Sequence, residues 1–355
     1  MKRIPMADLI ARHNRVADRL EPELLKWIRE GRYIGGPEVS RCEEAVASLF
    51  GRRFGVGVGS GTDAIALGLR ALGVQPGDDV LIPALSFFAT AGAVVHIGAR
   101  PVVVDVLEDQ PVMDPEAAKA ALTPRTTAVV VVHLYGATCP DPVLGVPVLE
   151  DSAQAAGQSP PACVGAVTAV SFYPTKTLGS AGDGGLVATD DESLADRVRA
   201  LGNHGHVAGE QHLHEKVGGH VGVNSRLDSV QAIIVQAHLA DLEVRVAHRR
   251  RLAARFDTAL GSGLTAVFRE PDHAVHQYVL RTKHRSALMA HLSAAGIDSS
   301  VYYPRSLASQ PAIAPQPPTP AADRWSAELL ALPCHVGVAE PEVVRIERAL
   351  QGFKP

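Results

Sequence analysis

The stretch of sequence that decides the fold reads VTAVSFYPTKTLG and spans residues 167–179. Its first six residues form an apolar run, which is typical of a strand buried on both faces of a sheet. A loop that contains Pro174, Lys176 and Gly179 follows directly. A lysine in such a loop can act as a nucleophile when it is desolvated or lies near another cation. Most lysines are solvated surface groups, so the rest of the chain must decide the role of Lys176.

Similar apolar runs alternate with helix-like segments through the first 190 residues. Six further runs, mostly rich in valine and bounded by Gly, Pro or Asp, lie at residues 54–59, 80–83, 101–106, 127–134, 146–149 and 185–189. Helices are expected between them at 63–72, 89–97 and 115–122. This alternation predicts an α/β fold in which a mainly parallel seven-stranded sheet lies between helices.

The second part of the chain has a different pattern. A helix at 192–201 leads into a Gly- and His-rich loop at 202–222, and residues 229–251 are expected to form one long helix. A strand at 276–281 and a helix at 286–295 follow. The pattern predicts a large domain over residues 1–235 and a smaller C-terminal α+β domain over 236–355.

The composition favours a cytoplasmic protein that binds neither nucleic acid nor membrane. The 355 residues carry a net charge of -4, and the basic cluster within 245–251 is expected to form a solvated helix face. None of the four cysteines forms a C-x-x-C pair. No apolar run approaches the roughly 18 residues that span a bilayer, and the N-terminus lacks the apolar core of a signal peptide.

Two further motifs follow predicted strands. GSGTD at residues 59–63 opens a helix, whose N-terminus could bind a phosphate. EDSAQ at 150–154 places acidic side chains at the carboxyl end of a strand, where open α/β sheets bind ligands. Each motif also suits an ordinary helix start, with Thr62 or Asp63 as the N-cap in the first case.

A loop rich in histidine invites a metal hypothesis. Two pairs in it have H-x-H spacing, but no acidic or cysteine partner accompanies them. We therefore expect no metal, and instead a polar loop that covers the active site and contacts a phosphorylated substrate. The five histidines are His204, His206, His212, His214 and His220.

Nine short motifs, in this order, resemble those of the DegT-type sugar aminotransferases, a family of fold-type I pyridoxal phosphate (PLP) enzymes. The resemblance covers nearly the full chain, and the ordered set is specific although each motif alone is weak. The motifs are GGPE (35–38), SGTDA (60–64), SFFATA (86–91), HLYG (133–136), EDSAQ (150–154), SFYPTK (171–176), GDGG (182–185), GVNSRLD (222–228) and VYYP (301–304).

The resemblance implies that PLP is the cofactor and that Lys176 binds it as a Schiff base. Asp151 would hold the protonated ring nitrogen, so that the ring can act as an electron sink. Gln154 would donate a hydrogen bond to the phenolic oxygen, and Phe87 would stack on the ring face.

The resemblance also implies a phosphate site and a shared active site. Gly61, Thr62 and Ser171 would hold the phosphate from one side. Asn224 would reach it from the other subunit of a homodimer.

Three further residues would contact substrates by the same resemblance. Arg226 would bind a carboxylate of the amino donor or of the sugar, and Tyr303 and His204 would contact the sugar substrate. The sequence departs from the family at Thr177, where relatives often have asparagine, and at residues 155–165, where an apolar, Pro-rich segment replaces a basic hairpin.

The implied function is amino transfer from an amino acid, glutamate by expectation, to a nucleotide-linked keto sugar. Residues 222–228, 276–279 and 301–312 resemble members that aminate C3 of a UDP-3-keto-N-acetylhexosamine or its uronate. A dTDP-linked 3- or 4-keto-6-deoxysugar is the alternative. PLP-dependent sugar dehydratases carry histidine in place of the lysine, so Lys176 argues against that class. A non-catalytic sensor would be expected to have lost some of these site residues.

Overall fold

A seven-stranded sheet forms the centre of the computed structural model, which describes residues 3–207, 210, 212–268 and 273–355. The strand order is β1-β7-β6-β5-β4-β2-β3, and only β7 is antiparallel to its neighbours. The predicted α/β fold and mainly parallel sheet are confirmed. The strands are β1 (Phe54–Val58), β2 (Asp79–Pro83), β3 (Arg100–Val104), β4 (Thr126–Val132), β5 (Val148–Asp151), β6 (Val167–Ser171) and β7 (Gly185–Thr189).

The reversed direction of β7 decides where Lys176 lies. Because β7 runs antiparallel to β6, the chain turns back after Ser171 at the edge where the parallel strands end. The connecting residues 172–184 therefore stay above the carboxyl ends of the parallel strands, the edge that binds ligands in open α/β sheets.

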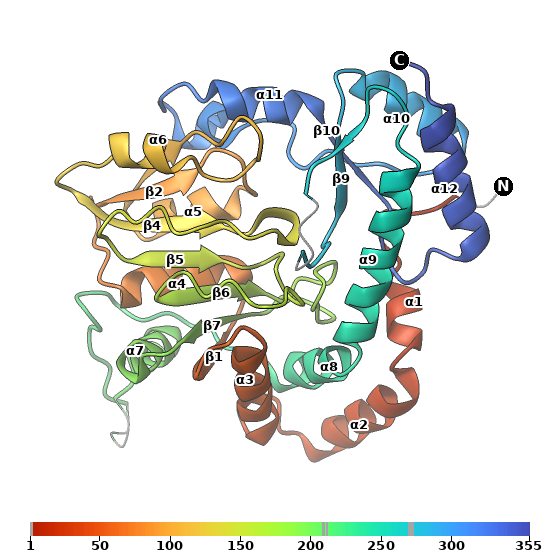
Figure 1. Ribbon diagram of the computed structural model, residues 1–355. Helices are drawn as coiled ribbons and strands as arrows, with labels where there is room; N and C mark the ends of the chain where they lie inside the picture. The colour runs from red at the N-terminus through yellow and green to blue at the C-terminus, as the bar shows by residue number, and fades with distance from the viewer. Residues whose placement is uncertain (1–2, 208–209, 211, 269–272) are drawn as a thin grey trace.

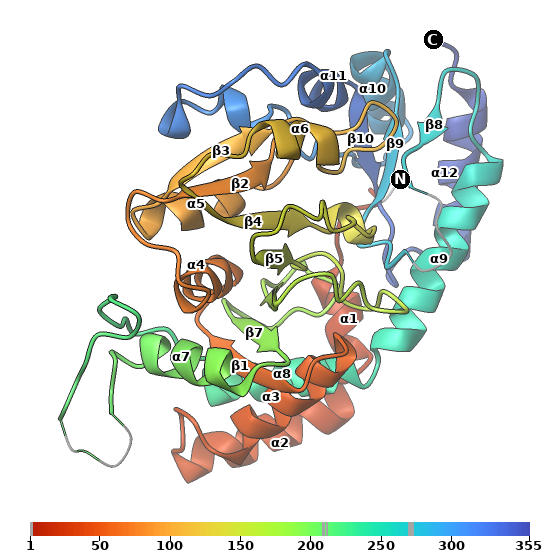
Figure 2. The same cartoon turned by 60° about the vertical axis from the view of Figure 1, so that its left-hand side comes forward.

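Helices cover both faces of the sheet, giving three layers (Figures 1 and 2). On one face, α4 (Gly61–Ala71), α5 (Ala89–His96) and α7 (Glu192–Gly202) pack on a common apolar core. On the other face lie α3 (Pro37–Leu49), α6 (Pro115–Ala120) and α8 (Ser229–Leu239). Short polar side chains fix several helix starts: Asp114 caps α6, which has proline at its first position, and Asp191 caps α7.

The single helix expected at 229–251 is two helices. The chain leaves α8 at Ala240, and α9 (Leu242–Thr258) begins after Asp241, whose backbone is not helical. The carboxylate of Asp241 accepts two hydrogen bonds from Arg15 and lies 3.3 Å from Nε of Arg245. The apolar periodicity continues through this turn, which is why it does not reveal the break.

The C-terminal part has a core of its own. A three-stranded antiparallel sheet, β10-β9-β8, packs with α9, α10 and α12. We propose the domain division expected at residue 235; the chain turns into this second core five residues later, between α8 and α9. The elements are β8 (Thr265–Ala266), β9 (Tyr278–Arg281), β10 (Leu329–Leu332), α10 (Arg285–Ala294), α11 (Pro320–Glu328) and α12 (Glu340–Gly352).

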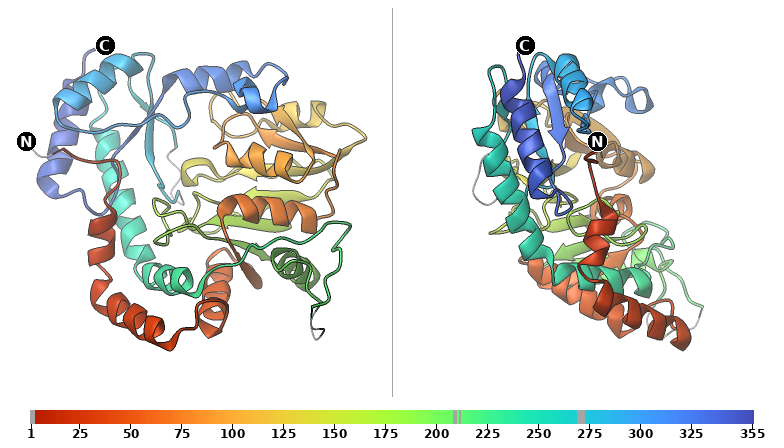
Figure 3. Two further views of the ribbon diagram at one scale, coloured as in Figure 1. Left: turned by 180° about the vertical axis from the view of Figure 1, so that it is seen from behind. Right: turned by 90° about the vertical axis from the view of Figure 1, so that its right-hand side faces the viewer.

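Two N-terminal helices complete the fold. α1 (Leu9–Asn14) and α2 (Ala17–Glu30) follow the outer edge of the molecule from the second core to α3 (Figure 3). Asp8 caps α1 by accepting a hydrogen bond from the backbone of Ala11. Throughout the described residues, no helix combines the length and apolarity that crossing a membrane requires.

Candidate active site

A cavity of about 420 Å³ lies at the carboxyl ends of β4, β5 and β6, beside the second core. Its walls include eight of the residues that the sequence singled out, which come from separate motifs up to 242 positions apart. They are Gly61, Thr62, Phe87, Asp151, Gln154, Ser171, Lys176 and Tyr303. The fold therefore brings most of the expected site together in one chain.

Lys176 lies in the loop that follows β6. Burial lowers the pKa of the Lys176 amine, and the nearby charge of Asp151 opposes this effect. A lowered pKa leaves more of the amine uncharged at neutral pH, which is the form that can attack a carbonyl carbon. Residues 276 and 277 line the same cavity, and burial and the charge of Lys176 hold the pKa of His276 well below its usual value.

Asp151, the last residue of β5, is held by two donors. Its Oδ2 accepts a hydrogen bond from Oγ1 of Thr90 (2.9 Å), and its Oδ1 accepts one from the backbone of Ala153 (3.2 Å). Thr90 is fully buried in α5, and its hydroxyl also bonds with that of Ser86 (2.8 Å). Sequence reasoning missed Thr90 as a site residue, although it lies within the SFFATA motif.

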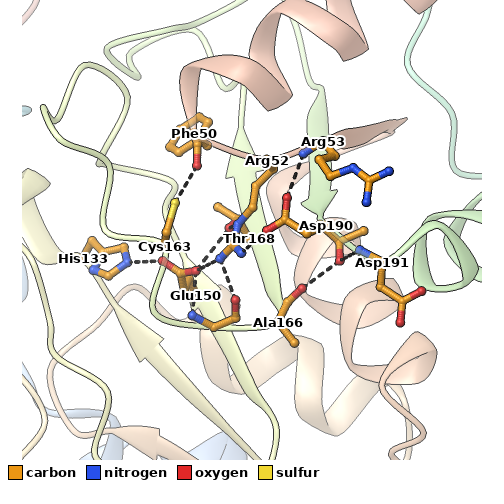
Figure 4. A network of polar contacts seen from close by, with 12 residues as sticks. Phe50, Arg52, Arg53, His133, Glu150, Cys163, Ala166, Thr168, Asp190 and Asp191 are labelled. Atoms are coloured by element: carbon orange, nitrogen blue, oxygen red, sulfur yellow. Dashed lines mark hydrogen bonds and ion pairs between the residues drawn. The ribbon is translucent and has the colours of Figure 1, made fainter.

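The carboxylate next in sequence, Glu150, belongs to a different network (Figure 4). It accepts hydrogen bonds from Arg52 (2.5 Å) and from Nε2 of His133 (2.9 Å), and Arg52 also pairs with Asp190 (2.9 Å). The His133 ring accepts a bond from a backbone N–H at its other nitrogen, so Nε2 carries the proton. Successive side chains of a strand point to opposite faces of the sheet. Glu150 therefore bonds to neighbouring strands, whereas Asp151 lines the cavity.

A small-residue cradle forms where α4 begins. Ser60 is the N-cap of α4, in place of the two alternatives considered from the sequence, and its hydroxyl accepts from the backbone of Asp63 (3.1 Å). A Cβ on Gly61 would lie 2.6 Å from Cβ of Ser171. The helix N-terminus and these two residues thus enclose a space that suits an anion such as a phosphate.

Aromatic side chains also line the cavity. The ring of Phe87 lies 5.9 Å from that of Tyr303, and Nε2 of Gln154 donates to the Tyr303 hydroxyl (3.2 Å). The carbonyl of the same amide accepts from the backbone of Tyr135 (2.7 Å). Phe87 is 56% exposed, which leaves its face open to a planar ligand.

Asn224, Arg226 and His204 do not line this cavity. Arg226 donates to the side chain of Asn203 (3.1 Å) and lines a separate surface groove. Asn224 forms an isolated β-bridge with Asn203, and the ring of His204 packs on that of His214. One chain alone therefore lacks three of the expected contacts. Within the described part of the chain, no three histidine, cysteine or acidic side chains cluster as metal ligands would.

The residues around the cavity fit PLP. The α4 N-terminus with Ser171 suits its phosphate, Asp151 suits a protonated ring nitrogen, and a desolvated lysine suits its aldehyde. A lysine, a carboxylate and a helix N-terminus around one cavity at the ends of parallel strands define a fold-type I PLP enzyme.

The chain belongs to the DegT/DnrJ/EryC1/StrS aminotransferase family, whose model matches residues 15–351. It is 36% identical to the UDP-2-acetamido-2-deoxy-3-oxo-D-glucuronate aminotransferase of Pseudomonas aeruginosa, over 94% of this chain and 95% of that protein. It is 37% identical to the UDP-N-acetyl-3-dehydro-alpha-D-glucosamine 3-aminotransferase of Acidithiobacillus ferrooxidans, over 98% of this chain and 97% of that protein.

Solved structures of family members have the same fold as this chain. The crystal structure of Streptomyces venezuelae DesV in complex with a ketimine intermediate matches with a TM-score of 0.93 at 36% identity, over 99% of this chain and 98% of that one. A family member from Brucella abortus matches with a TM-score of 0.90 at 33% identity, over 98% and 99% of the two chains. The protein is a PLP-dependent aminotransferase.

Proposed function

We propose that this enzyme moves an amino group from glutamate to C3 of a UDP-linked 3-keto-N-acetylhexosamine or its uronate. The observation that carries the proposal is the cavity that gathers Lys176, Asp151 and the α4 N-terminus. The names of the Pseudomonas and Acidithiobacillus relatives support a UDP-linked 3-keto acceptor. A dTDP-linked keto sugar is the second candidate, because a Streptomyces venezuelae relative at 36% identity is a dTDP-3-amino-3,4,6-trideoxy-alpha-D-glucose transaminase.

In this proposal, the cofactor supplies an electron sink that stabilises a carbanion, and the protein supplies binding and proton transfer. Nζ of Lys176 would hold the cofactor, and as a free amine it would accept and return the proton at the reacting carbon. The lowered pKa of Lys176 suits a group that must be uncharged before it can accept a proton.

The other side chains that line the cavity would orient the cofactor. Asp151 holds the ring nitrogen in its protonated form by charge, and Thr90 fixes the direction of that carboxylate. Gly61, Thr62 and Ser171, which line the cavity, would hold the phosphate. Phe87 would cover one ring face, and Gln154 would bind the phenolic oxygen.

A homodimer with shared active sites completes the proposal. Asn224 and Arg226 lie away from the cavity of their own chain, so they can serve the cavity of a second copy. Exposed apolar side chains at Leu25, Ile28 and Ile34 provide surface for such an interface. In this arrangement Arg226 binds a substrate carboxylate, and His204 and Tyr303 contact the sugar.

We also propose a cytoplasmic location. The four cysteines, Cys42, Cys139, Cys163 and Cys334, are all free. Free thiols are the normal state in a reducing compartment.

The decisive experiment compares the holoenzyme with Lys176→Ala. Wild-type protein should show the visible absorption of lysine-bound PLP, and borohydride should fix the cofactor on Lys176. Lys176→Ala should lose turnover while keeping its fold and dimer. Lys119→Ala removes an exposed lysine on α6 and should change nothing. A borohydride label on another residue would overturn the assignment.

Two additions separate the competing functions and substrates. Glutamate should bleach the visible band of an aminotransferase, whereas a dehydratase or a sensor would keep it. A panel of UDP- and dTDP-linked keto sugars should then restore the band with one sugar class only. Restoration by dTDP-linked sugars alone would reject the UDP-linked substrate and retain the aminotransferase.

A further inference from the structure

The turn that carries Lys176 is held from outside by basic side chains. Residues 176–180 are called here the lysine turn. Four backbone carbonyls of the lysine turn accept hydrogen bonds from three basic side chains. Arg12 on α1 donates to the carbonyls of Lys176 (3.2 Å) and Ser180 (3.5 Å). Arg245 on α9 donates to that of Thr177 (2.6 Å), and His238 on α8 donates to that of Gly179 (2.6 Å).

These side chains are buried at a cost. Arg12, His238 and Arg245 are 9%, 3% and 2% exposed. Burial lowers the pKa of Arg12 to about 10, that of Arg245 to about 9 and that of His238 to about 4. His238 is therefore neutral at pH 7, and its carbonyl partner requires the proton on Nδ1.

The expectation of a solvated basic helix face at 245–251 is wrong for Arg245. Its Nη atoms donate to two backbone carbonyls, those of Thr177 and His238. Asp241, the acidic group beside it, also accepts two hydrogen bonds from Arg15. Buried cations that donate hydrogen bonds to backbone carbonyls fix the position of that backbone.

The lysine turn is also braced from within. Backbone N–H groups of Lys176 and Ser180 donate to the carbonyls of Tyr173 (2.8 Å) and Phe172 (2.7 Å). The hydroxyl of Thr177 bonds to Nδ1 of His276 (3.1 Å). At Gly179, a Cβ would lie 2.7 Å from two carbonyl oxygens and 2.8 Å from Nη1 of Arg12. The turn has little room to take another conformation.

We propose that Arg12, His238 and Arg245 are positioning residues for amino transfer, which direct Lys176 into the cavity by holding the carbonyls of its turn. This rests on the proposed role of Lys176. The three residues come from α1, α8 and α9, so the N-terminal segment and the α8–α9 corner both control the geometry of the lysine.

The test compares Arg245→Met, Arg245→Lys and Arg250→Met as holoenzymes. Arg250 also lies on α9 and donates to backbone carbonyls, those of His273 and Gly157, which are outside the lysine turn. The readouts are kcat and KM with glutamate and the keto sugar, the pH midpoint of the visible cofactor band, and thermal unfolding.

For Arg245→Met we expect kcat to fall about tenfold or more, because small displacements of a reacting group are costly. The pH midpoint of the band should rise by about half a unit or more, since losing a cation and admitting water both favour the protonated lysine nitrogen. KM for the keto sugar should stay unchanged. Arg245→Lys should recover part of kcat, and Arg250→Met should keep the wild-type kcat and midpoint even where its stability falls.

Equal kcat and midpoint in the two methionine variants would overturn the proposal. If Arg245→Met fails to fold, Arg12→Met replaces it with the same expected shifts, and His238→Ala, which removes a neutral donor, should lower kcat in the same way. Borohydride labelling of the wild type separates the two levels of inference. A label on Lys176 with no effect of the variants rejects only the positioning role, whereas a label elsewhere rejects the proposed function itself.

Discussion

Asp151 depends on a hydroxyl that lies 61 positions away, that of Thr90. Thr90→Val keeps the shape of the side chain but leaves Oδ2 of Asp151 without that donor. Losing a partner of a buried acceptor costs about 1–3 kcal/mol, so the free energy of unfolding should fall by that amount. PLP should also bind more weakly, because the carboxylate is no longer held in one direction. Chemical denaturation and a PLP titration measure the two effects.

Thr123→Val is the matched control for this prediction. The hydroxyl of Thr123 donates to the buried carboxylate of Asp79 (2.8 Å), outside the cavity. This variant should lose stability and keep PLP affinity. Equal PLP affinities for the two variants would contradict the role given to Thr90.

A substitution at Gly61 tests whether the small-residue cradle at the start of α4 binds a phosphate. In Gly61→Ala the new Cβ would meet Cβ of Ser171 at 2.6 Å and its Oγ at 2.9 Å. Either α4 or the end of β6 must then shift, and the N–H groups at the helix start move with it. We expect the variant to lose more PLP on dialysis than the wild type, and the absorbance of the visible band measures this loss. Gly352→Ala, where a Cβ meets nothing within 4 Å, should retain PLP normally. Full retention in Gly61→Ala would argue against a phosphate there.

At the scale of elements, the Glu150 network joins the loop before β1, the ends of β7 and β4, and the interior of β5 and β6 (Figure 4). Burial opposes the charge of Glu150, but bonds from His133 and Gly165 and the charge of Arg52 outweigh it, so the pKa of Glu150 is lowered. A lowered carboxylate pKa stabilises the fold above the unfolded value of about 4.3, and this is lost as pH falls through the folded pKa.

Glu150→Gln should therefore be less stable than wild type by about 3–5 kcal/mol at pH 7, because it leaves buried Arg52 short of a counter-charge. The difference should shrink as the pH falls below about 4.3, where Glu150 of the unfolded chain becomes protonated, and should be lost once the pH passes the lowered pKa of the folded state. Denaturant unfolding at a series of pH values measures it. Glu108→Gln, in an exposed pair with Arg324, should match wild type throughout. A difference independent of pH would contradict the ionised network.

The elements differ in how well the sequence predicts them. The seven strands of the large sheet are apolar runs bounded by Gly, Pro or Asp, and the structure has a strand in each of them. The break between α8 and α9 was missed, because both helices keep an apolar face and the turn at Asp241 contains neither Gly nor Pro. α1 and α2 were also missed, since the N-terminal segment has no strand-to-helix alternation to mark them.

The same contrast holds for the candidate site. Lys176 and Asp151 could be placed at the cavity because their motifs include the ends of β6 and β5 at the ligand-binding edge, whereas Thr90 was missed although it lies within a motif. Arg12 could not, because it acts on a carbonyl 164 positions away. Arg245 was misread for a related reason: a basic helix face is normally solvated, and only packing against the lysine turn buries it.

At the scale of the whole molecule, the cavity of one chain gathers Lys176 and Asp151 but leaves Asn224 outside. If Asn224 serves the partner's cavity, two inactive variants should complement each other. In a heterodimer of Lys176→Ala and Asn224→Ala, one site receives Lys176 from one chain and Asn224 from the other. A random mixture is half heterodimers with one intact site each, so turnover should return to about a quarter of wild type.

The matched control mixes Lys176→Ala with Asp151→Asn. Lys176 and Asp151 line the same cavity of the same chain, so each site of that heterodimer carries one of the two defects. This mixture should remain inactive after subunit exchange, measured by turnover and by the visible band. Recovery in the control would place Lys176 and Asp151 in different chains. If the Asn224 mixture shows no turnover although mass spectrometry verifies the heterodimers, each chain builds its site alone. Recovery in the Asn224 mixture alone requires the shared site, because no single chain in it carries both intact residues.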